Sequence, residues 1–149
     1  MTDYENALSC LPPRLREVLD KLPDKMRDGV QEIRLRVGAP LVLSVGCTDW
    51  LLTREGAPIS REGTSLYICD YTLLSDCFQT LCEYSVHTHQ QEIRHGYISA
   101  KNGCRAGIAG TVVLENGQIT SMRRITSICL RVARAHTGCA NQLTNAVLQ

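Results

Sequence analysis

Aromatic residues are scarce in this chain, which has one Trp, one Phe and five Tyr among its 149 residues. Proteins that hold single-stranded nucleic acid stack its bases on exposed aromatic side chains. The low aromatic content therefore counts against a stacking platform of that kind. It also means that a hydrophobic core has to be built from Leu, Ile, Val, Ala and Cys.

Long apolar runs are absent as well. No segment approaches the ~20 consecutive apolar residues that a membrane-spanning helix needs. The first ten residues, MTDYENALSC, are polar and acidic, so they do not resemble a secretory signal peptide. We therefore expect a cytoplasmic protein without a transmembrane segment.

Closely spaced cysteine pairs are missing, although the chain has eight cysteines. A zinc site built from Cys104 and the histidines near it is an alternative, but their spacing matches no common structural site. Cytoplasmic thiols stay reduced, and a reduced cysteine often serves as a small buried hydrophobic residue. We expect that role for most of the eight, including Cys129 between Ile128 and Leu130, and we predict no metal site.

The common catalytic motifs are absent too. The sequence has no G-x-x-x-x-G-K-[ST] phosphate loop, no G-x-S-x-G elbow and no H-E-x-x-H pair. Acidic residues are sparse in the second half, which argues against a pair of catalytic carboxylates there. Cys104 as nucleophile with His95 as base is an alternative, but separate structural roles for the two residues are favoured. We therefore predict no catalytic residue in this chain.

The residues that are present suffice for one domain, since 44% are hydrophobic and 21% are charged. The charge is unevenly distributed. Residues 1–90 have 9 Lys and Arg against 13 Asp and Glu, and residues 91–149 have 7 against 2. A first part of charge −4 and a second of +5 indicate two electrostatic faces, head-to-tail stacking of copies, or a nucleic-acid surface.

Two regions have the periodicity of helices. Pro12 and Pro13 suit the first positions of a helix, and apolar residues then recur on one face, which predicts a helix over 12–22. Residues 3–10 are expected to form a short turn at most, and Asp24 is expected to cap another. Asp70 is predicted to cap a second helical region, over 70–93, in which one helix begins at Tyr71 and a second helical stretch begins near His87.

Two blocks of residues alternate between apolar and polar, as half-buried strands do. The first block predicts an antiparallel meander over 32–53, followed by a loop at 54–65. The second predicts a meander over 96–133, in which Asn116-Gly117 is a strong hairpin signal and separate strands cover 118–125 and 127–133. Strands in blocks joined by hairpins, with helices between the blocks, predict an α+β fold.

Glycine punctuates the second block at Gly103, Gly107 and Gly110. A loop that binds phosphate through its backbone is one interpretation of this spacing. A strand with a bulge, in which glycine allows close approach of another backbone, is the favoured one.

Arginine recurs through the second half, at Arg94, Arg105, Arg123, Arg124, Arg131 and Arg134. On neighbouring strands, some of these guanidinium groups have to share one surface. Such a surface suits phosphate, because the planar guanidinium can donate to two oxygens at once. The alternative is a solvated strand face with salt bridges to Glu32, Glu83 and Glu92.

Three stretches carry a resemblance to a known family: EIRLRVGAPL (32–41), RHGYISAKNGCRAGIAGTVVLENGQI (94–119) and SICLRVARAHTGCA (127–140). They are similar to the stage III sporulation protein AA family of endospore-forming bacteria, a relative of type II and type IV secretion and pilus ATPases. The motif positions are Arg34, Arg36, Gly38, Gly96, Tyr97, Gly103, Gly107 and Gly110. The sequence departs from the family at Asn102-Gly103 in place of Gly-Gly, at Cys104, where His is common, and at Ala106 in place of Val.

The resemblance implies a PAS-like N-domain of the kind found in secretion ATPases. Residues 1–137 would then be a regulatory and oligomerisation domain, and residues 138–149 would begin a linker helix to an ATPase domain that lies outside this chain. In the family, the phosphate loop follows shortly after that point. We therefore expect this chain alone to hold no cofactor and to hydrolyse no ATP, and we expect the full-length protein to use ATP and Mg²⁺.

The resemblance also implies partners. In related motors, the N-domain packs against the ATPase core of a neighbouring subunit in a hexameric ring, and its arginines reach the nucleotide phosphates. The corresponding contacts in trans are expected from Arg105, Arg123, Arg131 and Arg134, acting as charge stabilisers. A homo-hexamer in the mother cell is implied, at the periphery of the membrane, held there by membrane-bound stage III partner proteins of a channel to the forespore.

Two other functions stay open at this point. The basic second half predicts a nucleic-acid-binding module whose affinity falls steeply with salt, although the scarcity of aromatic residues counts against nucleic acid as a partner. A thiol- or metal-dependent enzyme using Cys104 and the histidines is the other.

Overall fold

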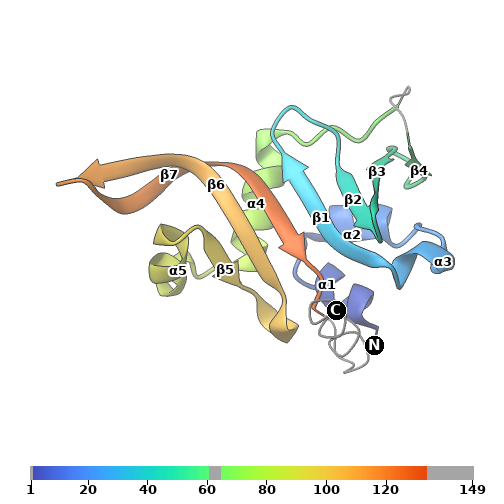
Figure 1. The fold of residues 1–149 in the computed structure, drawn as a ribbon, viewed down its shortest axis with the longest axis horizontal. Coiled ribbons are helices and arrows are strands. Elements are labelled where there is room, and N and C mark those ends of the chain that lie inside the picture. The colour runs from blue at the N-terminus through green and yellow to red at the C-terminus, as the bar shows by residue number, and fades with distance from the viewer. Residues whose placement is uncertain (1, 61–64, 134–149) are drawn as a thin grey trace, which may run out of the picture.

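A computed structural model describes residues 2–60 and 65–133, with the backbone alone over 119–123. Its strands form one seven-stranded sheet in the order β4-β3-β2-β1-β7-β6-β5, and every pair is antiparallel (Figure 1). The predicted α+β fold class is therefore confirmed. The elements are α1 (Asp3–Leu8), α2 (Pro13–Leu19), α3 (Asp24–Arg27), β1 (Val30–Arg36), β2 (Val42–Val45), β3 (Thr48–Leu52), β4 (Pro58–Ile59), α4 (Tyr71–Leu81), the 3₁₀ helix η1 (Val86–His89), α5 (Gln90–Arg94), β5 (Tyr97–Ser99), the 3₁₀ helix η2 (Lys101–Gly103), β6 (Arg105–Glu115) and β7 (Gln118–Arg131).

The two predicted meanders meet along one seam, where β1 pairs with β7. Ile33 lies opposite Leu130 and Leu35 opposite Ile128 across this seam. All four side chains are buried. The blocks at 32–53 and 96–133 are therefore the two halves of one sheet.

The helices cover one face of this sheet. Figure 1 places α1, α2 and α4 behind β1 and β7, and their apolar side chains form one core with the strands. Full burial of a Leu or Ile side chain contributes about 1.5–3 kcal/mol. The largest fully buried side chains are Tyr4, Leu11, Leu15, Leu19, Leu22, Leu73 and Leu74 from the helical segments and Ile33, Leu35, Leu41, Leu43 and Leu52 from the strand segments.

The predicted helix starts agree with the structure. Pro13 is the first residue of α2, where proline costs no hydrogen bond. The Asp70 carboxylate accepts a hydrogen bond from the backbone N–H of Leu73 at 2.7 Å and so caps α4. The third start differs, because Pro23 is the cap residue of α3 and Asp24 is its first residue, paired with Arg27.

The predicted helix bounds agree with the structure in part, since α2 ends at Leu19 and not at residue 22. The predicted division of the helical region over 70–93 is confirmed, because Glu83 and Tyr84 have φ values of 52° and 60°, which no α-helix contains, and they lie between α4 and η1. The segment at 3–10 is more than a turn. It contains the six-residue helix α1, which Thr2 caps and which places Tyr4 in the core with its hydroxyl donating to the Leu19 carbonyl.

Two strand predictions also change. The segment expected to be a loop at 54–65 contains β4, which pairs with β3. The strands expected at 118–125 and 127–133 are one strand, β7, because shifts of register absorb the irregular residues without breaking the pairing with β6.

The hairpin between β6 and β7 forms where it was predicted. Asn116 and Gly117 have φ values of 54° and 78°, as a type I′ turn requires, and Figure 1 shows the ribbon extending beyond the helices. At Gly110, a Cβ atom would lie 1.9 Å from the Arg124 carbonyl oxygen. The favoured interpretation of this glycine, a bulge with close backbone approach, is confirmed.

Candidate functional site

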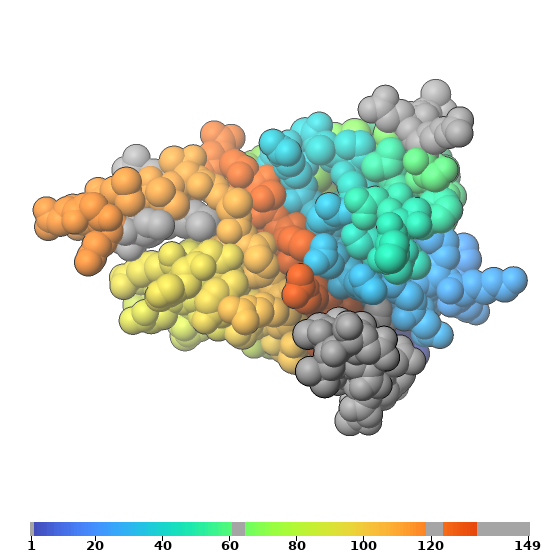
Figure 2. Space-filling view, viewed as in Figure 1, coloured from blue at the N-terminus to red at the C-terminus, as the bar shows by residue number. Residues whose placement is uncertain are grey.

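The sheet face opposite the helices carries the polar side chains of its central strands. Along β1, Ile33 and Leu35 point into the core, whereas Arg34 and Arg36 point to the other face. The same alternation holds on β7 and β6. Figure 2 presents this face, with β1, β7 and β6 side by side at the surface.

Strand register arranges these side chains in three rows across the sheet. Each row is a run of directly opposed residues on β1, β7, β6 and, for the first two rows, β5. The rows are Glu32–Arg131–Arg105–Ser99, Arg34–Cys129–Gly107–Tyr97 and Arg36–Ser127–Ala109. Four arginines therefore surround a central area of small residues.

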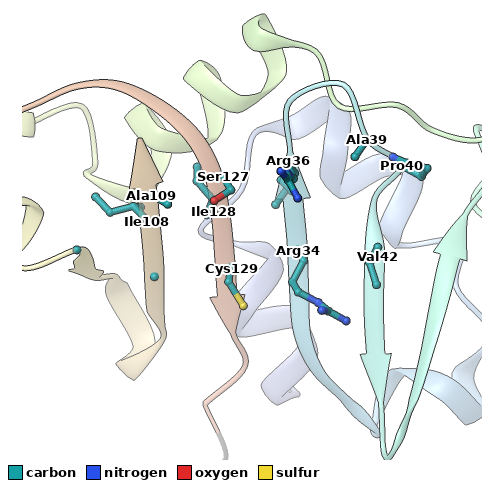
Figure 3. A pocket seen from close by; sticks show the side chains of 13 residues that line it. Arg34, Arg36, Ala39, Pro40, Val42, Ile108, Ala109, Ser127, Ile128 and Cys129 are labelled. Atoms are coloured by element: carbon teal, nitrogen blue, oxygen red, sulfur yellow. The ribbon is translucent and has the colours of Figure 1, made fainter. Parts of the chain in front are cut away.

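A hollow of about 580 Å³ lies over this central area. In Figure 3, Arg34 and Arg36 rise from β1 while Ser127 and Cys129 rise from β7. A second hollow of about 270 Å³ shares Gly107 and Cys129 with the first and is bordered by Tyr97, Arg105 and Arg131. We call the two adjoining hollows the arginine trough.

Two of the four arginines are neutralised by carboxylates. Arg34 donates to Asp49 at 2.6 Å and to the Ser44 hydroxyl at 3.1 Å. The hydrogen bond from Arg34 lowers the pKa of the Asp49 carboxyl, and the Ser44 hydroxyl lowers it further. Arg131 pairs with Glu32 at 3.1 Å. These contacts direct each guanidinium group toward a neighbouring strand.

The other two arginines have no carboxylate partner among the described residues. Arg105 lies over the Tyr97 ring, with its guanidinium carbon 3.9 Å from the ring centre. Arg36 is exposed, and its side chain has no hydrogen bond or ion pair within the described part of the chain. The trough therefore has two guanidinium groups whose charge is available to an anion.

The predicted phosphate contacts are only partly brought together. Arg105 and Arg131 are directly opposite each other on β6 and β7. Arg123 belongs to the outer part of β7, and its side chain lies outside the described atoms, as does the whole of Arg134. Arg36 was expected only as a motif residue, and the structure adds it to the arginines that border the trough. The alternation in EIRLR indicated that Arg36 lies on the polar face of a strand, but not which strand lies beside it.

Two further details concern the arginines of the second half. Arg124 lies over the ring of Tyr71, 4.9 Å from its centre, and so supports the join between β7 and α4. Of the three salt-bridge partners predicted for the arginines, Glu32 forms an ion pair with Arg131. Glu92 instead accepts from the Ser99 backbone and pairs with His89 at 3.0 Å.

The motif glycines have two different structural roles. Gly38, Gly96 and Gly103 have φ values of 82°, 84° and 76°, so they allow turns that other residues resist. Gly107 lies in an ordinary strand conformation, and a Cβ atom there would meet nothing within 4 Å. Because Gly107 has no side chain, the space above it belongs to both hollows of the trough.

The expectation for Cys129 needs correction. Its side chain is half-buried on the open face, with Sγ 3.5 Å from Glu32 Oε2. Burial and the neighbouring carboxylate raise the pKa of this thiol to about 11. Cys10, Cys69, Cys77, Cys82 and Cys104 are buried as expected, Cys47 is exposed, and Cys139 lies outside the described residues.

The arrangement does not favour a thiol enzyme. Cys104 is buried beside α1, whereas His95 is bonded through Nδ1 to the Gln91 carbonyl at 2.7 Å. Within residues 2–60 and 65–133, no three side chains of the metal-binding types lie close enough together to hold an ion.

Comparison with known proteins agrees with the family resemblance. The family model "Sporulation stage III, protein AA" matches residues 1–149. The chain belongs to this family. It is 29% identical over 133 residues to the stage III sporulation protein AA of Bacillus subtilis (strain 168), covering 89% of this chain. It spans 39% of the length of that relative.

A solved structure is also similar. The Legionella pneumophila ATPase DotB matches 81% of this chain and 27% of its own, with 16% sequence identity and a TM-score of 0.37. The described helices include none that is long and apolar enough to cross a membrane.

Proposed function

We propose that this chain is the N-terminal, non-catalytic domain of a stage III AA-type secretion ATPase. In this proposal, residues 1–137 contribute to ring assembly and residues 138–149 lead to an ATPase core. The arginine trough faces the ATPase core of a neighbouring subunit, and the domain couples ATP hydrolysis there to a channel complex between mother cell and forespore.

The observation that supports this role is the unpaired charge of the trough. Arg36 and Arg105 lie on one solvent-facing surface, and neither has a carboxylate partner among the described residues. A hollow bordered by arginines concentrates anions and attracts partners of negative charge. Nucleotide phosphates are the anion that a neighbouring ATPase core would present.

In this proposal, the arginine trough acts on the phosphates by electrostatic stabilisation. A guanidinium group aimed at the phosphates stabilises the negative charge that develops during transfer, without donating electrons or removing a proton. Arg34 and Arg131 are held by their carboxylates, so they support the shape of the trough. Arg36 and Arg105 are free to bind phosphate oxygens.

ATP and Mg²⁺ belong to the longer protein in this proposal. A homo-hexamer, located in the mother-cell cytoplasm beside the membrane and held by membrane-bound stage III proteins, is the assembly in which the trough would meet a neighbour. Arg134 lies outside the described residues and Arg123 belongs to β7, so both stay candidate contacts.

The experiment is ATP turnover by the longer protein that contains both the domain and the core. Arg36→Gln and Arg105→Gln should each lower kcat by about tenfold or more, because an arginine supplied in trans contributes at least that much in phosphoryl transfer. Arg54→Gln is the matched control, since Arg54 is exposed but lines neither hollow. Unchanged kcat in both trough variants, with rings intact by light scattering, would contradict the proposal.

A further inference from the structure

A second group of reactive side chains lies away from the trough, where α1 meets η2. The Asn102 side chain donates to the Ser9 hydroxyl at 3.0 Å and to the Asn6 carbonyl at 3.4 Å. These contacts join residues that are more than ninety positions apart in the sequence. They hold the end of the first helix against the turn that leads into β6.

Two cysteines meet at this junction. Cys10 Sγ donates to the Lys101 carbonyl at 3.5 Å, and the backbone N–H of Cys104 donates to the same carbonyl at 3.3 Å. The two cysteines therefore share the Lys101 carbonyl as a hydrogen-bond acceptor. Both side chains are at most 2% exposed. The tertiary fold therefore brings two buried, reduced cysteines together at one carbonyl group.

The environment shifts the pKa values of the two thiols in opposite directions. The hydrogen bond from Cys10 lowers the pKa of Cys104 to about 6 in spite of burial, and a hydrogen bond from the backbone of Ala133 lowers it further. The same contact and burial raise the pKa of Cys10. Burial raises the pKa of Cys69 and of Cys82 to about 11, so these thiols stay protonated at neutral pH.

We propose that Cys10 and Cys104 are a redox-active pair that hydrogen peroxide converts into a disulfide, which fastens α1 to the start of β6. The Cys104 thiolate attacks one peroxide oxygen, the O–O bond breaks, and a sulfenic acid and hydroxide form. Cys10 then loses its proton, and its sulfur displaces hydroxide from the Cys104 sulfur. In sum, two thiols lose two hydrogen atoms and one peroxide molecule becomes two molecules of water.

The position of the pair gives the bond a structural effect. α1 has six residues, and a short terminal helix opens more readily than the centre of a sheet, which admits a small oxidant. Once formed, the disulfide prevents α1 from leaving the sheet.

The test is peptide mapping of the full chain under non-reducing conditions after treatment with hydrogen peroxide. We expect one linked peptide pair that contains Cys10 and Cys104, lighter than the sum of the free peptides by two hydrogen atoms. A thiol reductant should reverse the link, and the melting temperature should rise by several degrees when it forms. The wild-type map needs no variant, so the result does not depend on whether a substitution folds.

Two variants sharpen the test. Cys47→Ser should keep the link, because Cys47 is exposed and free. Cys10→Ser, checked for folding by circular dichroism, should leave a sulfenic acid on Cys104 that a dimedone probe captures. Peroxide added to protein unfolded in urea should give disulfides between many different pairs of cysteines. A free Cys10 beside an over-oxidised Cys104 in folded wild type, or links that mainly involve Cys47, would overturn the proposal.

Discussion

Arg131 on β7 lies directly opposite Glu32 on β1, and the two side chains form an ion pair of 3.1 Å across the seam of the sheet. The pair fixes one edge of the arginine trough and marks the register in which the two halves of the sheet join. The apolar side chains that stabilise the seam lie on the opposite face, and their contribution to stability can be measured.

The buried side of the seam should dominate its stability. Leu35 is 1% exposed, so Leu35→Ala should lower the free energy of unfolding by about 2–5 kcal/mol, from lost burial and the cavity left behind. Leu114→Ala removes the same atoms from a side chain that is 60% exposed and should cost about 0.5 kcal/mol or less. Urea unfolding measures both. Equal losses would mean that the seam is not part of the core.

The two strand glycines should respond differently to an added methyl group. Gly110→Ala places a Cβ atom 1.9 Å from the Arg124 carbonyl oxygen, so it should lower stability by about 1–3 kcal/mol. Gly107→Ala meets nothing within 4 Å and should change stability by about 0.5 kcal/mol or less. Thermal unfolding checks this pair, and a Gly110→Ala protein as stable as wild type would contradict the close approach of β6 and β7.

The cap of α4 gives a smaller effect. Asp70→Ala removes the acceptor of the Leu73 N–H and should cost about 0.5–2 kcal/mol. Asp70→Ser keeps an oxygen at the cap position and should recover most of the loss. If the serine and alanine variants unfold at the same urea concentration, the cap does not contribute.

The ion pair between Asp49 and Arg34 should make stability depend on pH in the acid range. The folded protein lowers the pKa of Asp49, so the contribution of this carboxylate is present above its unfolded pKa of about 4. The contribution is lost as pH falls through the lower, folded pKa. The stability difference between wild type and Asp49→Asn should therefore shrink between about pH 5 and pH 2. A difference that stays constant over this range would show that the pair adds nothing.

Nucleic acid should bind weakly. Tyr97 is the one aromatic residue that borders the trough among the described residues, and Arg105 covers its ring. A single-stranded oligonucleotide should therefore gain charge contacts without base stacking, and its binding should vanish at physiological salt. Fluorescence anisotropy across a salt series measures this. Binding that survives physiological salt would favour the nucleic-acid function instead.

Local signals in the sequence were enough for much of the fold. Proline at the start of α2, the Asp70 cap and the Asn116-Gly117 turn each act within a few residues, so their effects could be predicted. The helix α1 and the strand β4 were missed because each is short and depends on distant contacts. Tyr4, for example, is fixed by a hydrogen bond to Leu19 and by burial.

The candidate site was predictable only in part for the same reason. The sequence indicated that arginines of the second half share a surface, and Arg105 and Arg131 do lie opposite each other. It could not indicate that Arg36 joins them, because β1 and β7 are far apart in the chain. Cys129 was expected in the core, since its neighbours are apolar, and strand alternation placed it on the open face.

The sequence by itself determined the family, the alternation of each strand and the caps and turns, because these depend on residue order over short distances. Only the tertiary structure decided which strands meet. The pairing of β1 with β7 brings Arg34 and Arg36 beside Ser127 and Cys129, and the packing of α1 brings Cys10 to Cys104. Such long-range contacts form because burying the core outweighs the entropy lost in closing long loops, and no local pattern specifies them.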